Sequence, residues 1–153
     1  MAAINWKCSE FRELTLHDLY SLLQLRAAVF VIEQNCLYQD LDGNDQIAKH
    51  VTGTRDEKLL CYARILPPNA KYKTPSIGRV LTHQTIRHDG YGKQLISKAI
   101  DYCHQYWPTE AITISAQQHL QRFYSEFAFV TESEPYLEDG IPHIQMRREF
   151  SPN

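Results

Sequence analysis

Ser76-Ile77-Gly78-Arg79-Val80-Leu81-Thr82, followed after a polar connection by Arg87-His88-Asp89-Gly90-Tyr91-Gly92-Lys93, is the segment on which the rest of the chain depends. Its first part is short, β-branched and apolar, which is typical of a buried strand. After Lys93, apolar residues recur every three or four positions until Trp107, and this spacing predicts a helix that Pro108 ends. Gly90 and Gly92 lie where that helix begins. The free backbone amides and the positive end of the helix dipole there favour an anion, above all a phosphate.

The glycine pattern differs from two common phosphate-binding motifs. A Walker loop requires Gly-x-x-x-x-Gly-Lys-Ser/Thr, and a dinucleotide fingerprint requires a third glycine where this chain has Leu95. The pattern that remains, Arg87-x-x-Gly90-x-Gly92 after a strand, resembles the pyrophosphate loop of the GNAT superfamily, whose members use acetyl-coenzyme A (acetyl-CoA). Taken alone, the loop is equally compatible with a glycine-rich turn that binds no ligand.

Length and composition narrow the classes of protein to consider. The chain has 153 residues, 43% of them hydrophobic and 22% charged, so we expect a single domain over residues 1–153. A net charge of −2 gives no indication of nucleic-acid binding. No signal segment or membrane-spanning run is evident, which predicts a cytoplasmic protein that does not bind a membrane. The cysteines are scattered, and we expect buried thiols rather than disulfides.

A first helix is predicted over residues 15–34, with one apolar stripe formed by Leu16, Leu19, Leu23 and Phe30. Arg26 and Glu33 fall on that same stripe, where a core helix would carry apolar residues. Either the two side chains pair with each other or extend to the edge of the core, or the stripe leaves the core there and faces a cleft.

The polar loop after this helix carries Asp40, Asp42 and Asp45. The spacing loosely resembles a calcium loop, but it lacks the terminal Glu and the second helix of an EF-hand. We therefore expect no metal site, and we interpret the aspartates as an acidic substrate rim or as turn residues.

The rest of the chain alternates strands and helices. Strands are predicted over residues 49–55, 59–66, 76–82, 111–116, 129–131 and 143–148, and helices over 93–107 and 119–127. With an initial strand and the first helix, this order predicts a mixed α/β domain with a partly parallel central sheet flanked by helices. The crossover from Val80 to Ser115 is a βαβ unit, which places the phosphate loop at the carboxyl end of a strand.

A second segment supports the same superfamily. Gln117-x-x-Leu120-x-x-Phe123-Tyr124-x-x-x-Ala128-Phe129 resembles the GNAT segment Asn-x-x-Ala-x-x-Leu-Tyr-x-x-x-Gly-Phe. Alanine at position 128 predicts a backbone that does not need positive φ. The segments Leu23 to Gly43 and Gly140-Ile141-Pro142-His143-Ile144 look similar to the ElaA-like branch, so the resemblance covers nearly the whole chain and implies the GNAT fold.

The resemblance implies an acetyltransferase that moves an acetyl group directly from acetyl-CoA to a small-molecule or peptide amine in a ternary complex, as a monomer or homodimer. It implies that the backbone of Val80, Leu81 and Thr82 pairs with the pantetheine arm. It also implies that the cofactor is bound by Gln117 and by the pyrophosphate loop, which consists of Arg87, His88, Asp89, Gly90, Tyr91, Gly92 and Lys93. Tyr124 matches the position that protonates the departing sulfur. A phenol, with a pKa of about 10, is protonated at neutral pH.

The acceptor side is less defined. We expect Arg26, Phe30 and Asp40 to border the acceptor, and the acidic loop favours a cationic amine. The general base is Glu33, if it lies on the cleft wall, or one of several histidines that are each also common as structural residues: His50, His83, His119 and His143, of which His83 is best placed.

Other functions remain possible at this stage. Cys36 as a thiol nucleophile has no supporting local signature. Arg26-x-x-Val29-Phe30 and the acidic residues after it also resemble acyl-homoserine lactone synthases, although the chain is short for that family. A protein that binds acyl-CoA without turnover is the remaining alternative.

Overall fold

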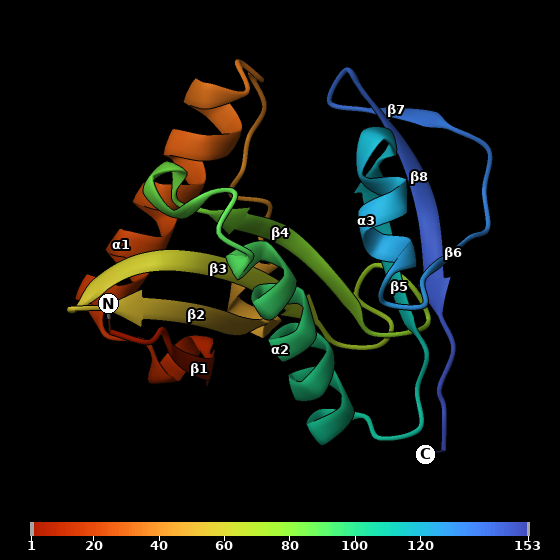
Figure 1. The fold of residues 1–153 in the computed structure, drawn as a ribbon, viewed down its shortest axis with the longest axis horizontal. Coiled ribbons are helices and arrows are strands. Elements are labelled where there is room, and N and C mark those ends of the chain that lie inside the picture. Colours follow the sequence, from red (N-terminus) through yellow and green to blue (C-terminus); the bar gives the residue numbers. More distant parts are fainter. Residues whose placement is uncertain (1, 153) are drawn as a thin grey trace.

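The computed structural model describes residues 2–152, which form one eight-stranded mixed sheet with helices on both faces (Figure 1). The strand order is β1-β2-β3-β4-β5-β8-β6, with β7 paired to β8. The bounds are β1 Asn5–Glu10, β2 Lys49–Arg55, β3 Lys58–Leu66, β4 Ser76–Thr82, β5 Ile112–Gln117, β6 Val130–Thr131, β7 Tyr136–Glu138 and β8 Ile141–Arg148. Among the strands of residues 2–152, only β4 and β5 pair in parallel, and the other pairs are antiparallel. The predicted mixed fold with a partly parallel sheet is confirmed.

The helical segments differ in length and type. They are α1 Leu16–Arg26, the π-helix η2 Ala27–Glu33, α2 Tyr91–Tyr106 and α3 Gln121–Ser125, with 3-10 turns η1 Phe11–Glu13, η3 Asp45–Ile47, η4 Gln84–Ile86 and η5 Gln118–Leu120. No helix within residues 2–152 is long and apolar enough to cross a bilayer.

Side chains that alternate along β3 divide the core into two layers. Cys61, Ala63 and Ile65 pack in the cluster that contains the buried face of α2, whereas Tyr62 packs with α1 on the other side of the sheet. Ile96 and Ala99 of α2 are among the least exposed residues of the first cluster, as the three- and four-residue spacing predicts. The sheet is therefore covered on both faces, and its loops carry the residues of the site.

The first helix departs from its prediction in phase and in type. Leu16 is 87% exposed, while Leu22 and Leu25 are buried, so the apolar face is shifted by one residue from the predicted stripe. α1 also ends at Arg26, and the amides of Gln34 and Cys36 bond to carbonyls five residues back in a π-helical turn. A periodicity counted at 3.6 residues per turn does not anticipate this wider turn, which is a frequent feature of functional sites.

Two turns near the C-terminus also differ from expectation. Ala128 has a φ of 65°, so the prediction that this position avoids positive φ was wrong. Alanine accepts roughly 1–2 kcal/mol of backbone strain to lead α3 into β6. Strand β7, which ends at Glu138, is not among the strands predicted from the sequence. The turn itself is Asp139-Gly140, where both φ angles are positive.

Candidate active site

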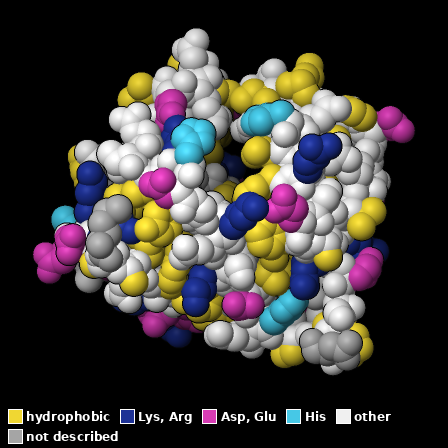
Figure 2. Space-filling view, viewed as in Figure 1, with side chains coloured by type: hydrophobic (Ala, Val, Ile, Leu, Met, Phe, Trp, Pro, Cys, Tyr) yellow, Lys and Arg dark blue, Asp and Glu magenta, His cyan; other side chains and the backbone are white. Residues whose placement is uncertain are grey.

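β4 and β5 separate soon after they meet, which opens a cleft in the middle of the sheet. They pair in register only at Ser76 and Thr113. Further along β4, Arg79 has a φ of 51°, and the register with β3 shifts between Tyr62 and Arg64. A bulge of this kind bends its strand away from the neighbouring strand. Figure 2 shows the surface hollowed between the two halves of the molecule.

Two adjoining cavities occupy this cleft. The larger one lies against the end of β4, the loop before α2 and the helix α3. The smaller one lies between η2, the bulge of β4, strand β5 and the β7–β8 turn. The residues that line both cavities are Phe30, Gln34, Val80, Gln117, Leu120 and Tyr124. Two molecules that enter from opposite sides can therefore meet beside these shared residues.

The N-terminus of α2 is built to receive an anion at the edge of the larger cavity. Gly90, the residue before α2, has a φ of 85°, and His88 has a φ of 69°. In the described part of the chain no side chain caps the helix, so its first amides keep their capacity to donate. A Cβ added at Gly90 would meet no protein atom within 4 Å, so space for a ligand remains beside the backbone. A sixteen-residue helix with an open N-terminus suits a phosphate group.

Tyr124 lies at the junction of the two cavities. Its ring packs edge-on against Phe123 and Phe129, and only 7% of the residue is exposed. Within residues 2–152, the Tyr124 hydroxyl has no hydrogen-bond partner. Burial raises the pKa of Tyr124 to about 12. The hydroxyl therefore keeps its proton at neutral pH and is free to donate it to a group in the cleft.

The sequence model of the Acetyltransferase (GNAT) domain matches residues 17–150. The chain belongs to this acetyltransferase family. It is 45% identical to the protein ElaA of Escherichia coli over 148 residues, which covers 95% of this chain and 97% of ElaA. A solved acyl-CoA N-acyltransferase from Pseudomonas aeruginosa superposes with a TM-score of 0.92 at 43% identity, over 95% of this chain and 99% of that one. The resemblance seen in the sequence is confirmed.

A solved CoA-dependent acyl-homoserine lactone synthase shares only the fold. It superposes with a TM-score of 0.79 at 13% identity, over 97% of this chain and 84% of that one. A shared fold does not identify the acceptor.

The GNAT cofactor residues predicted from the motifs lie around the larger cavity. Val80, Leu81, Thr82, Arg87, His88, Gly92 and Gln117 line it. Asp89, Gly90, Tyr91 and Lys93 do not line the cavity but continue the same loop into the first turn of α2. There Tyr91 Oη receives a 2.5 Å hydrogen bond from Arg55, and Lys93 pairs with Glu126 at 3.0 Å.

Glu33 and Arg87 form an ion pair across the mouth of the larger cavity. One guanidinium nitrogen of Arg87 lies 2.8 Å from Glu33 Oε2, the other binds Oε1, and Arg87 also donates to the Thr82 carbonyl at 3.1 Å. The hydrogen bonds from Arg87 lower the pKa of the Glu33 carboxyl. Glu33 therefore lies on the cleft wall, as one interpretation expected, but its pairing makes it a weak proton acceptor.

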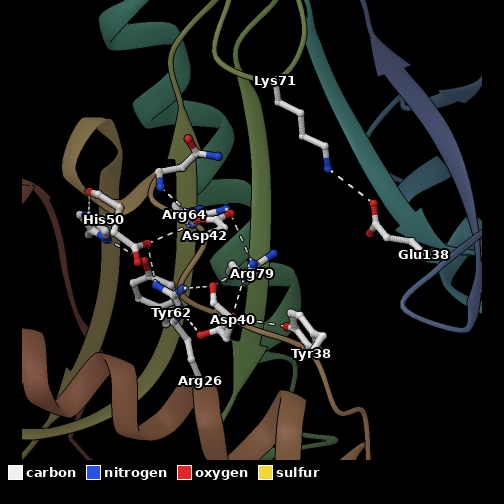
Figure 3. Close-up of polar contacts among 12 residues, drawn as sticks. Arg26, Tyr38, Asp40, Asp42, His50, Tyr62, Arg64, Lys71, Arg79 and Glu138 are labelled. Atoms are coloured by element: carbon white, nitrogen blue, oxygen red, sulfur yellow. Dashed lines mark hydrogen bonds and ion pairs between the residues drawn. The ribbon is translucent and has the colours of Figure 1, made fainter.

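Arg26 and Asp40 lie beneath the cleft rather than on its surface. Arg26 is fully buried, and it binds Asp40 Oδ2 at 2.8 Å and Asp45 Oδ1 at 2.7 Å (Figure 3). Of the interpretations left open by the sequence, pairing of Arg26 with Glu33 does not occur, because Arg26 turns inward to the acidic loop. Neither Arg26 nor Asp40 lines either cavity, whereas Phe30, the third predicted acceptor residue, lines both.

The acidic loop is neutralised by arginines from three elements. Arg64 of β3 binds Asp42 at 2.7 Å and Asp45 at 3.0 Å, and Arg79 of β4 binds Asp40 at 2.7 Å. Burial opposes ionisation, but hydrogen bonds from the arginines hold the pKa of Asp42 and of Asp45 below their usual values. These carboxylates are therefore occupied, and the argument that the loop attracts a cationic amine does not hold.

The candidate histidines fall in different places. His50 is buried between the Tyr62 hydroxyl and the Asp45 carbonyl, and His83 contacts Thr85 at the start of η4. Neither lines the larger or the smaller cavity of the cleft. His119 lines the larger cavity and His143 lines the smaller one. Cys36 also lines the smaller cavity, with its thiol 3.2 Å from the Asp139 carbonyl.

Sequence reasoning missed the carboxylate that faces His143. Glu138 Oε2 lies 3.3 Å from His143 Nε2, across the β7–β8 turn. The available signal was a Glu and a His on either side of a short Asp-Gly turn, a spacing that brings them together only if both flanking segments are strands.

Proposed function

We propose that this GNAT protein transfers an acetyl group from acetyl-CoA to an amine while both are bound in the cleft. The observation that carries the proposal is the position of Tyr124, a protonated and unpartnered hydroxyl at the junction of the two cavities. The donor enters through the larger cavity with its pyrophosphate at the N-terminus of α2, and the acceptor enters through the smaller one.

The chain's own residues supply what acyl transfer requires. The end of β4 lines the larger cavity and has lost its neighbour where β5 diverges, so its backbone can pair with an extended ligand. Tyr124 donates its proton to the departing sulfur, which turns a poor leaving group into a neutral thiol. Direct transfer is favoured because the Cys36 thiol hydrogen-bonds to a backbone carbonyl, an interaction that does not activate it as a nucleophile.

The test combines two readings on the same sample. The protein is incubated with acetyl-CoA and a panel of amines, free thiol is measured, and the amines are examined by mass spectrometry for a mass gain of one acetyl group. Thiol release together with an acetylated amine is expected. Coenzyme A binding by calorimetry without thiol release for any amine would instead identify a binding protein without turnover.

A further inference from the structure

His143 and Glu138 form a pair of proton acceptors that faces the smaller cavity. His143 Nδ1 lies 2.7 Å from the Ile141 carbonyl oxygen, which can only accept, so Nδ1 carries a hydrogen. In the neutral ring Nε2 then has no hydrogen, and it points at Glu138 Oε2, 3.3 Å away. The proton between these two atoms comes either from a donor in the cavity or from Nε2 of the protonated ring.

Neighbouring groups fix the Glu138 carboxylate in this orientation. Its other oxygen, Oε1, receives a 3.3 Å hydrogen bond from Ser115 and lies 3.6 Å from Lys71 Nζ. Figure 3 shows Lys71 extending toward Glu138 from the loop before β4. This pair lies apart from the arginine network, which is formed by Arg26, Arg64 and Arg79 with the aspartates of the acidic loop. The ring of Tyr136 stacks on His143 with centroids 6.3 Å apart. Both members of the pair are therefore held in place, and Oε2 is left for a further donor.

The charges around the smaller cavity favour a cation. Arg79 lines this cavity, but its guanidinium is bound to Asp40 and Asp42. Lys71 is bound to Glu138, and Asp139 in the adjoining turn forms no ion pair with any residue in 2–152. Lys71 balances the charge of Glu138, so the Asp139 carboxylate leaves one uncompensated negative charge at the cavity.

We propose that His143 is the general base for an aliphatic primary amine, and that Glu138 binds this acceptor as its ammonium ion. This inference deepens the proposed acetyl transfer and rests on it. The ammonium group donates one hydrogen bond to Glu138 Oε2 and gives a proton to His143 Nε2. The imidazolium that forms is then stabilised by the same carboxylate.

The proposed step balances in protons and electrons. Loss of one proton to His143 leaves a lone pair on the amine nitrogen, which forms the new C–N bond at the thioester carbon. The C–S bond breaks, its electron pair goes to sulfur, and the sulfur takes the Tyr124 proton. After the C–N bond forms, the nitrogen still carries two protons. One of them passes to the Tyr124 oxygen and restores the phenol, which leaves the neutral amide. His143 then releases its proton to solvent.

The decisive comparison is between amines that need a base and amines that do not. The alkylammonium acceptors to test are 1,4-diaminobutane and an N-acetylated peptide with one lysine. Comparison of their rates shows whether the cleft prefers a small free amine or a peptide side chain. An arylamine such as 4-methoxyaniline is uncharged at neutral pH. Removal of a general base should therefore slow the alkylamine reaction and leave the arylamine reaction nearly unchanged.

Two variants and a control make the test specific. His143→Gln should lower kcat for the alkylamine by about 10²-fold or more, while the arylamine rate changes less than about threefold. Glu138→Gln should raise the KM for the alkylamine and leave the KM for the arylamine unchanged, because the carboxylate that would bind an ammonium ion is lost. His17→Gln, on the exposed side of α1, should change neither quantity.

Coenzyme A affinity, measured by calorimetry for every variant, shows whether the fold and the donor site are intact. If His143→Gln does not fold, the change in the alkylamine KM of Glu138→Gln, with the arylamine KM as the reference, decides the question. Unchanged alkylamine kinetics in a variant that binds coenzyme A would overturn the inference, as would coenzyme A binding by the parent protein without acetylation of any alkylamine. Failure of the parent to bind coenzyme A would overturn the proposed function itself, and the inference with it.

Discussion

Asp40 binds Arg79 at 2.7 Å across 39 positions of sequence, and Arg79 is the residue at which β4 bulges with a φ of 51°. The same carboxylate binds the buried Arg26, so one side chain connects the first helix to the bend that opens the cleft. The arginine network therefore acts on the active site through its shape, and none of its members needs to touch a substrate.

The network predicts a specific loss of stability in acid. Asp45→Asn should lower the free energy of unfolding at pH 7 by roughly 3–5 kcal/mol, because it leaves Arg26 and Arg64 with less than their balancing charge. The folded pKa of Asp45 lies below its unfolded value of about 3.9, so its contribution is complete above that value and is lost as pH falls through the folded pKa. Denaturant titrations should show the parent and the variant converging below about pH 4.

Asp56→Asn is the matched control, because Asp56 is exposed in the β2–β3 turn and asparagine tolerates its φ of 50°. Its stability should stay within about 0.5 kcal/mol of the parent at every pH. A similar loss in both variants would show that the network is not what stabilises the loop.

Gly90→Asp should weaken coenzyme A binding by at least about tenfold while the protein stays folded. The added carboxylate would stand beside the open N-terminus of α2 and repel a phosphate. Asparagine has the same shape as aspartate and tolerates positive φ, so Gly90→Asn separates the effect of the added charge from that of backbone strain. Calorimetry should show a smaller loss for asparagine than for aspartate. Equal affinities in both folded variants and the parent would place the pyrophosphate elsewhere.

Glu33→Gln distinguishes a positioning residue from a base. Since Glu33 binds Arg87, its loss should loosen the loop and raise the KM for acetyl-CoA a few-fold, with kcat within about twofold of the parent. Steady-state kinetics with both substrates varied separates these quantities. A large fall in kcat at unchanged coenzyme A affinity would restore Glu33 as the general base.

Much of the fold could be predicted because its signals are local. The strand bounds Ser76–Thr82 and Lys49–Arg55 agree with the sequence prediction, and the apolar spacing after Lys93 identified the buried face of α2. The π-helical turn after Arg26 could not be predicted, because its apolar pattern differs from that of an α-helix by a single residue. The positive φ of Ala128 was missed because alanine seldom adopts it.

The site was only partly predictable. Loop and strand motifs located the residues around the larger cavity, because they are contiguous in sequence. The partners of Arg26 lie 14 and 19 residues away, and Arg87 and Glu33 lie 54 apart, so neither ion pair has a sequence signal. A charged residue on an apolar stripe indicates a buried partner or a cleft, and only the tertiary structure separates these. Here Arg26 is buried and bound to two carboxylates, whereas Glu33 lies on the wall of the cleft.

The kcat of Tyr124→Phe, on an amine that the parent protein acetylates, tests the central claim most directly. The substitution removes one unpartnered oxygen and keeps the packing against Phe123 and Phe129, so stability should be nearly unchanged. We predict a fall in kcat of about 10²-fold or more with the KM for acetyl-CoA unaltered, because the phenol acts only as the sulfur becomes anionic. With the pKa of Tyr124 at about 12, the parent should show no loss of rate from phenol ionisation up to about pH 10. An unchanged kcat in the folded variant would contradict the account and assign Tyr124 to packing alone.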